Sequence, residues 1–223
     1  NETISAIRAI GIRGCSVSMP FKEEAAALVD ELSPPALKIG AINTIVNNDG
    51  KLYGENTDYF AISKALKEID KKIETALVLG YGGMAKACLL ALEDTLDITP
   101  SVAVRPKLSR TIEKHYRVIN WDERNEGQYD LIINATPIGM ASMAREIPFD
   151  VDSCDPNSVV FDAVSSPTVT RLNKEARKRG ISFLPGTELA LLQSYKQFQL
   201  YTGHFPPEKK MREVLYSHLG QNS

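Results

Sequence analysis

The sequence predicts an α/β protein of two domains, one of which carries a parallel β-sheet. Three observations lead to this fold class. Helical and strand patterns alternate along the chain, which is the order typical of α/β folds. Several short apolar runs are bounded by turn residues and have the character of buried parallel strands. A glycine-rich turn joins one of these runs to a helical segment.

The composition is that of an ordinary globular protein, and it narrows the possible functions. The chain has 223 residues, of which 43% are hydrophobic and 24% charged, and its net charge is −2. This charge argues against a nucleic-acid or an anionic membrane surface, and no apolar run is long enough for a membrane span. The three cysteines and three histidines show no metal-ligand spacing. We therefore expect a metal-free cytoplasmic protein, either a monomer or a homodimer.

The first residues of the chain are expected to form helices and a strand. The sequence starts at Asn1 without a methionine, so we expect the natural beginning to be missing. Pro20 should open a helix with acidic residues in its early part, and Ser33-Pro34-Pro35 should end it. The elements predicted here are a helix over 3–10, a strand over 12–17 and a helix over 21–32.

A β-hairpin is predicted in the stretch GAINTIVNNDGKLYGENTD. Its arms, residues 42–46 and 51–54, flank the turn-forming Asn48-Asp49-Gly50. A helix over 59–69 should follow, with Asp58 as its N-cap. The polar stretch DKKIE after that helix is a plausible domain boundary.

The remainder of the chain carries the signals of a parallel sheet and of two C-terminal helices. The strand candidates are TALVLG, SVAVR, YDLIINAT and SVVFDAV. A helix, GGMAKACLLAL, should follow the first of them. The C-terminal helices are expected over 188–201 and 207–219.

The strand-to-helix connection in LVLGYGGMAKA has the spacing of a dinucleotide-binding turn. Gly80 permits a tight turn, Gly82 permits close approach of a pyrophosphate, and the small Ala85 permits close packing of helix on sheet. The helix N-terminus offers free N–H groups to phosphates. The alternative is a glycine-rich connection that binds nothing. With its correct flanks, the motif predicts a Rossmann-type domain.

The end of the next predicted strand favours NADP over NAD. An NAD site usually has an acidic residue there, which accepts a hydrogen bond from the ribose 2′-hydroxyl. In this chain the strand is followed by Arg105 and Lys107, whose positive charges suit a 2′-phosphate. The alternative is two solvated basic residues.

The first half of the chain supplies candidates for the reacting groups. Lys22 lies in the first turn of its predicted helix, where a positive charge opposes the helix dipole. Ser16 and Ser18 lie on one side of the extended segment before it. Asp58 follows the second of two Asn-Thr dipeptides around the hairpin. The alternatives are that Lys22 is an ordinary surface lysine and that Asp58 is only a helix N-cap.

Together these motifs closely resemble the shikimate dehydrogenase family, in its shikimate dehydrogenase-like branch. The resemblance covers nearly the whole chain in the family's order. It is carried by VSMPFKEEAAALVDELSPPALKIGAINTIVNNDGKLYGENTD, VLGYGGMAKACLLAL, INATPIGM and PGTELALLQSYKQFQLYTG.

The resemblance implies roles for particular side chains. Lys22 and Asp58 match the catalytic lysine and aspartate of the family, with Lys22 as general acid/base. The implied substrate contacts are Ser18, Asn43, Asp58 and Gln193. The implied cofactor contacts are Gly80, Gly82, Gly83, Met84, Arg105, Thr136 and Gly186.

The implied function is an NADP-dependent oxidoreductase that interconverts a cyclic hydroxy acid and its ketone, as in the shikimate/3-dehydroshikimate reaction. This reaction belongs to the chorismate pathway of aromatic amino acid biosynthesis. One alternative is a quinate or other hydroxy-acid dehydrogenase of the same superfamily. A second is a non-catalytic NADP-binding regulator.

Some positions depart from the family pattern. Ser16 stands where the family has an asparagine, and Ser165 stands at the position of a substrate-binding tyrosine. The family's N-terminal serine pair, which holds the substrate carboxylate, would lie before the first residue. Shikimate is therefore expected to be a poor substrate.

The expected architecture is a discontinuous substrate domain and an NADP-binding domain. The predicted limits are 1–72 for the substrate domain, 73–186 for the Rossmann-type domain and 187–223 for helices that return to the substrate domain. The active site should lie in the cleft between them.

Overall fold

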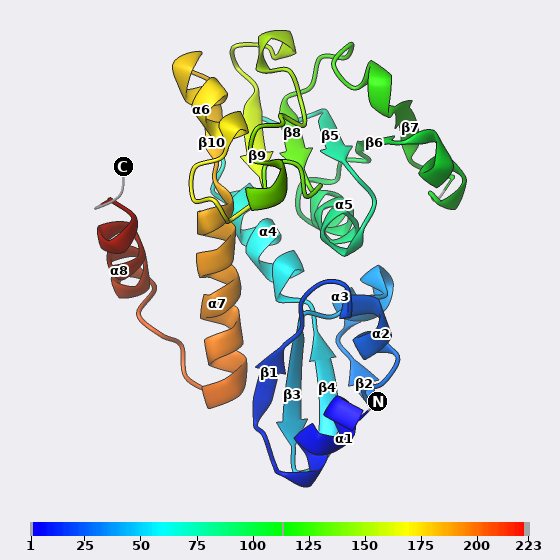
Figure 1. Ribbon diagram of the computed structural model, residues 1–223, viewed down its shortest axis with the longest axis vertical. Helices are drawn as coiled ribbons and strands as arrows, with labels where there is room; N and C mark the ends of the chain where they lie inside the picture. The colour runs from blue at the N-terminus through cyan, green and yellow to red at the C-terminus, as the bar shows by residue number, and fades with distance from the viewer. Residues whose placement is uncertain (1, 113, 221–223) are drawn as a thin grey trace. The chain divides into compact units, whose positions relative to one another are not determined.

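The computed structural model describes residues 2–112 and 114–220 and divides the chain into two compact units. The first unit comprises Asn1–Ala61 and Leu191–Ser223, and the second comprises Ile62–Ala190. Both divisions fall inside a helix, α4 (Thr57–Lys67) and α7 (Gly186–Thr202). The domain limits at 72 and 186 remain a prediction. The α/β fold class is confirmed (Figure 1).

The first unit contains a four-stranded sheet in the order β1-β3-β4-β2 (Figure 1). Its strands are β1 (Gly14–Ser16), β2 (Glu31–Leu32), β3 (Thr44–Asn48) and β4 (Lys51–Glu55). The predicted hairpin is present as β3 and β4, which pair antiparallel. Asp49 and Gly50 form its turn with φ of 52° and 90°. Two successive positive φ values suit the right-handed twist of the arms.

The helices of the first unit differ from the prediction around residues 21–35. The helix α2 (Lys22–Ala26) is short, and Glu31–Leu32 pairs in parallel with β4 instead of continuing it. Pro34 and Pro35 begin the helix α3 (Pro34–Ile39), which Ser33 caps by accepting from the Ala36 N–H. Proline suits a first helical turn because that turn needs no N–H partner. The residues 33–35, which were expected to end a helix, therefore begin one.

The helix α4 begins one residue earlier than its expected cap. The Asn56 side chain accepts from the N–H of Tyr59 at 3.0 Å, so Asn56 occupies the capping position. Asp58 lies inside the first turn. The prediction that Asp58 caps this helix was wrong, because the helix already begins at Thr57 and Asn56 caps it, which leaves the Asp58 carboxylate for another partner.

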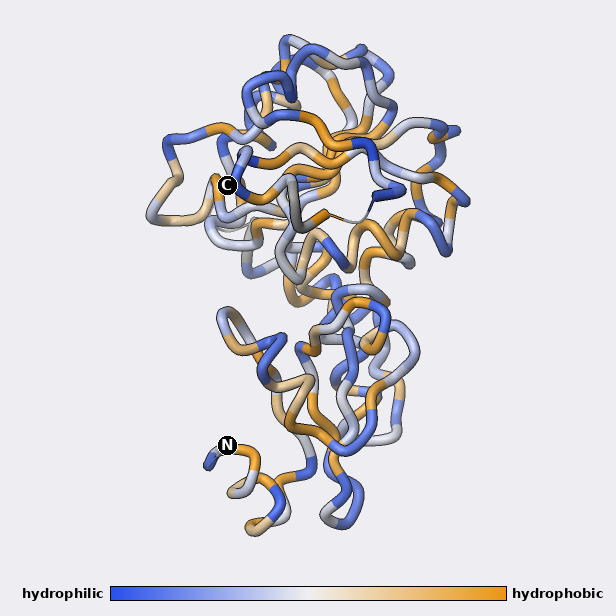
Figure 2. The backbone as a smooth tube through the Cα atoms, turned by 90° about the vertical axis from the view of Figure 1, so that its right-hand side faces the viewer, coloured by the Kyte–Doolittle hydropathy of each residue, from blue (hydrophilic) through white to orange (hydrophobic). Residues whose placement is uncertain are grey.

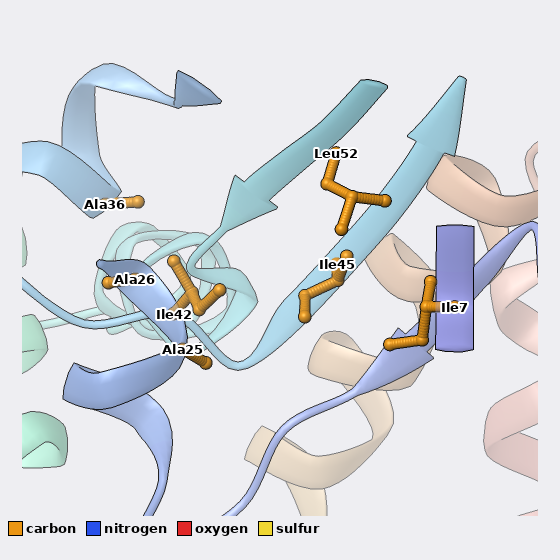
Figure 3. Packing of buried hydrophobic residues seen from close by; sticks show 7 residues of the cluster. All are labelled: Ile7, Ala25, Ala26, Ala36, Ile42, Ile45 and Leu52. Atoms are coloured by element: carbon orange, nitrogen blue, oxygen red, sulfur yellow. The ribbon is translucent and has the colours of Figure 1, made fainter. Parts of the chain in front are cut away.

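A small apolar core holds the first unit together (Figure 3). It contains side chains from both strands of the hairpin and from the helices α1 (Glu2–Ala9), α2 and α3. Its buried members are Ile7, Ala25, Ala26, Ala36, Ile42, Ile45 and Leu52. Since α2 contributes only alanines to this core, it can pack close to the strands of the hairpin.

The second unit contains a six-stranded parallel sheet in the order β10-β9-β8-β5-β6-β7. Its strands are β5 (Ala76–Leu79), β6 (Ser101–Val104), β7 (Arg117–Asn120), β8 (Leu131–Asn134), β9 (Val159–Asp162) and β10 (Ser182–Leu184). The four strands predicted from apolar runs are present. Figure 2 shows hydrophobic strand segments in the interior of this unit. The edge strands β7 and β10 were not predicted, because β7 is exposed at most of its positions and β10 has only three residues.

Helices complete the second unit and the end of the chain. Within the second unit, α5 (Gly83–Leu96) follows β5, and α6 (Arg171–Lys178) lies between β9 and β10. The end of the chain forms α7 and α8 (Glu208–Gly220), as predicted. Among the described residues, no helix is long and apolar enough to cross a membrane.

Candidate active site

The first unit brings the two predicted catalytic side chains into direct contact. Lys22 is the first residue of α2, and Asp58 lies in the first turn of α4. The Lys22 Nζ donates to the Asp58 Oδ2 over 2.5 Å, and the two side chains are 16% and 2% exposed. A charge-assisted bond of this kind fixes the direction of a flexible lysine. The pair can therefore present a proton to an oxygen atom bound beside it.

Asn43 lies near this pair because hydrogen bonds tie it to both helices. Its neighbour Ile42 donates its N–H to the carbonyl of Lys22 at 2.9 Å. The Asn43 Oδ1 accepts from the N–H of Thr57 at 2.8 Å, one residue before Asp58. Asn43 is fully buried, and within the described part of the chain its Nδ2 has no hydrogen-bond partner. A buried donor without a partner is costly. This amide therefore suits a polar group of a ligand.

The two Asn-Thr dipeptides of the hairpin have different roles. Asn56 is used inside the fold, where it caps α4 and donates through Nδ2 to the carbonyl of Ala41 at 2.9 Å. The hydroxyl groups of Thr44 and Thr57 lie 2.9 and 3.0 Å from the Oδ1 of Asn43. The Nδ2 of Asn43 thus has no described partner, whereas that of Asn56 already donates within the fold.

Two further predicted substrate contacts belong to the same unit. Ser18 is exposed in the segment between β1 and α2, and Gln193 is partly buried on α7. Ser16, at the end of β1, contacts α7 through its hydroxyl group. The roles of Ser18 and Gln193 toward a substrate stay predictions.

The structure adds two polar residues that the sequence reasoning missed. Gln197 is buried on α7, and its Nε2 donates to the Thr44 Oγ1 at 2.9 Å. The hydroxyl of Tyr201 lies 3.5 Å from the Ser16 Oγ, and burial raises the pKa of Tyr201. Both follow Gln193 at intervals of four residues, which places the three side chains on one face of the helix. That spacing was the signal that could have found them.

In the second unit, the glycine-rich turn has the conformation that its sequence predicts. Gly80 has φ of 102°, which other residues rarely adopt. Gly82 precedes α5, and a Cβ atom added there would meet nothing within 4 Å. Ala85 is fully buried against the sheet. The first N–H groups of α5 are thus presented on an open backbone, which is the geometry that phosphate binding needs.

The segment after β8 lies beside this turn. A Cβ atom on Gly80 would come within 3.1 Å of the Thr136 Cγ2. The Asn134 Oδ1 accepts from the Thr136 hydroxyl at 2.7 Å, and the Asn134 Nδ2 donates to Asp162 at 2.9 Å. Burial raises the pKa of Asp162, against hydrogen bonds from Thr170, the Val164 N–H and Asn134. This network holds Thr136 in place at the end of its strand.

The remaining predicted cofactor residues occupy strand and helix ends of the second unit. Gly83 and Met84 are the first two residues of α5, and Arg105 is exposed directly after β6. A Cβ atom on Gly186 would collide with the carbonyl of Val164, so glycine is required there for close packing. Since β5, β6 and β8 are parallel neighbours, Gly80, Arg105 and Thr136 follow the same edge of the sheet. The residues present fit a dinucleotide.

Comparison with protein families agrees with this arrangement. Residues 1–45 match the family model described as "Shikimate dehydrogenase substrate binding domain". The chain is 33% identical to the shikimate dehydrogenase (NADP(+)) of Maridesulfovibrio salexigens, over 97% of this chain and 81% of that protein. It is 36% identical to the shikimate dehydrogenase-like protein of Haemophilus influenzae, over 96% of this chain and 81% of that protein.

Solved structures give the same result for the fold. The shikimate 5-dehydrogenase of Thermus thermophilus, in complex with NADP(H) and shikimate, matches with a TM-score of 0.85 and 29% identity. That match covers 97% of this chain and 82% of the other. The quinate dehydrogenase of Corynebacterium glutamicum, in complex with NAD, matches with a TM-score of 0.86 and 28% identity, over 97% and 82% of the two chains.

Proposed function

The chain belongs to the shikimate dehydrogenase family, and from this premise we propose how its residues carry out the reaction. It is an NADP-dependent oxidoreductase that interconverts a cyclic hydroxy acid and its ketone, of the shikimate/3-dehydroshikimate type. The family places this reaction in aromatic amino acid biosynthesis. The observation that supports the proposed roles is the Lys22–Asp58 contact beside the free amide of Asn43.

Lys22 exchanges the proton of the reacting oxygen. NADP, when bound, accepts or supplies the hydride at the carbon that bears this oxygen. In the direction of reduction, the Lys22 ammonium group donates a proton to the carbonyl oxygen and is left as the amine. In the direction of oxidation, the amine takes the hydroxyl proton. Asp58 holds the lysine at 2.5 Å and accepts from it in both directions.

The substrate is held by polar groups of the first unit. Asn43 donates through Nδ2 to an oxygen substituent on the substrate's ring, and Asp58 accepts from a hydroxyl group of the substrate. Ser18 and Gln193 provide further hydrogen bonds. Such a set suits a small ring with several hydroxyl groups, because each hydroxyl group can both donate and accept.

The cofactor is held by groups at one edge of the parallel sheet. The backbone at Gly80, Gly82, Gly83 and Met84 receives the pyrophosphate at the start of α5. Thr136, which lies beside Gly80, and Gly186 would complete the cofactor contacts. Arg105, exposed after β6, binds the 2′-phosphate that distinguishes NADP from NAD.

Replacing Arg105 with alanine should narrow the preference for NADP over NAD. A hydrogen bond to a charged group contributes about 1.5–3 kcal/mol, or roughly 10- to 100-fold in affinity. Calorimetric titration of both cofactors would measure the change. Arg117→Ala is the matched control, since Arg117 is also exposed but lies at the opposite end of the adjacent strand β7. Tighter binding of NAD than NADP by the unmutated protein would contradict the assignment.

Replacing Ser165 with tyrosine should lower the Michaelis constant for shikimate. Ser165 stands where the family has a substrate-binding tyrosine, and it is exposed, so a larger side chain can be accommodated. One added neutral hydrogen bond contributes about 0.5–1.5 kcal/mol, or about 3- to 10-fold. Steady-state kinetics would measure it, with Ser166→Tyr as the control for an aromatic group elsewhere in the same loop. Equal Michaelis constants for Ser165→Tyr and the unmutated protein would show that residue 165 does not contact the substrate.

A steady-state assay of NADP reduction tests the proposed function directly. Shikimate, quinate and related cyclic hydroxy acids should be compared as substrates at saturating cofactor. The similarity to a quinate dehydrogenase makes quinate the main competitor. NADP binding without turnover of any of these compounds would favour the non-catalytic regulator instead.

The cellular location is part of the proposal. None of the three cysteines, Cys15, Cys88 and Cys154, forms a disulfide bond in the structure. Cysteines that form no disulfide suit a reducing compartment, and we place the protein in the cytoplasm.

A further inference from the structure

Gln197 occupies a place in the first unit that the proposed mechanism does not use. It lies on α7, is 9% exposed, and its side-chain amide contacts Ser16 of β1 and Thr44 of β3, which are paired neighbours in the sheet. The Ser16 Oγ donates to its Oε1 at 3.3 Å, and its Nε2 donates to the Thr44 Oγ1 at 2.9 Å. A buried amide with hydrogen bonds at both ends is held in one orientation.

A backbone carbonyl group determines which end of the Gln197 amide faces β3. The Nε2 of Gln197 also lies 3.4 Å from the backbone carbonyl of Asn43. A carbonyl oxygen can only accept, so the atom that faces it must be the donor nitrogen. The same nitrogen faces the Thr44 hydroxyl, which therefore receives a hydrogen bond from Gln197.

The orientation of the Gln197 amide in turn determines the direction of the hydrogen bond between Thr44 and Asn43. Because its oxygen accepts from Gln197, its hydrogen is free to donate to the Asn43 Oδ1 at 2.9 Å. That oxygen also accepts from the Thr57 N–H, a group that can only donate, at 2.8 Å. The Thr57 hydroxyl donates to the same oxygen at 3.0 Å, so Thr44 and Thr57 together hold the Oδ1 inward. The Nδ2 is left as the buried donor without a partner in the part of the chain that the structure describes.

We propose that Gln197 is a positioning residue that acts through Thr44 to keep the Nδ2 of Asn43 directed at the substrate. This inference rests on the proposed function, in which Asn43 binds a substrate oxygen. An amide turned over by half a rotation would present Oδ1 instead, which cannot donate to a carbonyl or carboxylate oxygen. Together with Thr57, Gln197 therefore favours the orientation in which Asn43 donates to a substrate oxygen, without contacting the substrate itself.

Gln197→Glu tests this proposal with almost no change of volume. At mildly alkaline pH the carboxylate can only accept, so it takes the Thr44 hydrogen and removes it from Asn43. We expect the Michaelis constant for the best substrate to rise about 10-fold or more, while kcat changes by less than about 3-fold. Gln197→Met, which removes both polar atoms and keeps much of the volume, should raise the constant less. Gln199→Glu on the same helix is the control and should change neither parameter, since the hydrogen bond described for the Gln199 side chain is with Lys196 and not with Thr44 or Asn43.

A second measurement does not depend on turnover. The side-chain amide signals of Asn43 can be assigned in a nitrogen-15 NMR spectrum by their loss in Asn43→Asp. They should shift in Gln197→Glu and in Gln197→Met, and stay in place in Gln199→Glu. Unchanged Asn43 signals and an unchanged Michaelis constant in both Gln197 variants would overturn the proposal, even if Lys22→Ala abolished turnover. Shifted signals in a protein that turns over no cyclic hydroxy acid would instead count against the proposed function, and leave the control of Asn43 by Gln197 intact.

Discussion

Lys22→Ala is expected to lower turnover by roughly 10²- to 10⁴-fold, the usual contribution of a positioned proton donor. The lysine is held against Asp58 in the first unit, whereas the predicted dinucleotide contacts belong to the second. NADP affinity should therefore barely change. Stopped-flow or steady-state kinetics would give the turnover, and calorimetry would give the cofactor affinity of the same sample.

Two further variants sharpen this result. Lys22→Met keeps much of the side-chain volume and removes the charge, so it separates proton transfer from packing. Lys38→Ala, at an exposed position of α3, is the control for the loss of one lysine from the same unit and should leave turnover unchanged. Near-normal turnover in either Lys22 variant would show that this residue is a surface lysine with an ion-pair partner.

Asp58→Ala is expected to destabilise the protein as well as lower its turnover. The Asp58 side chain is 2% exposed, and its removal leaves the Lys22 ammonium group, 16% exposed, without its partner. Breaking such a pair from one side costs about 3–5 kcal/mol, and the partial exposure of the lysine favours the lower end, about 3 kcal/mol. Urea unfolding would measure the loss as a lower midpoint with an unchanged slope.

A double variant separates the cost of an unpaired charge from the loss of packing. Lys22→Met combined with Asp58→Ala should be more stable than Asp58→Ala alone, because no charge is left unpaired. Glu74→Ala is the control, since it removes one side of an ion pair with Lys72 that is mostly exposed, and it should change stability little. If Asp58→Ala unfolded at the same urea concentration as the unmutated protein, the Lys22–Asp58 contact would not stabilise the fold.

The parts of the fold that were predictable are those with strong local signals. Apolar runs identified β5, β6, β8 and β9, because strands buried on both faces carry nearly continuous hydrophobic residues. The turn at Asp49 and Gly50 was recognisable because few residues tolerate its positive φ values. The edge strands β7 and β10 lack such runs, since one side of each has no neighbouring strand to bury it.

The helix predicted over residues 21–32 was too long, because pairing with the sheet outweighs the local helix propensity at its end. The alanine- and acid-rich stretch after Pro20 favours a long helix, yet the helix ends at Ala26. Leu32 instead pairs with Gly54, where a Cβ atom would collide with Leu32 itself. A two-residue strand against a glycine has no local signature, because its stability comes from a partner more than twenty residues away in sequence.

The sequence by itself determined the kind of chemistry. The glycine spacing from Gly80 to Ala85, the arginine after the second strand and the motifs around Lys22 and Asp58 identify the residue types and their order along the chain. Those signals are local, because turns and helix starts depend on neighbouring residues.

Only the tertiary structure decided which polar side chains meet. Lys22 reaches Asp58 because α2 and α4 start beside the same end of the hairpin. Among the described residues the Asn43 Nδ2 has no partner, whereas the Asn56 Nδ2 donates to the carbonyl of Ala41. Gln197 contacts Thr44 from a helix more than 150 residues away. Such contacts depend on how distant elements pack together, and the residues next to each partner in the sequence do not indicate that packing.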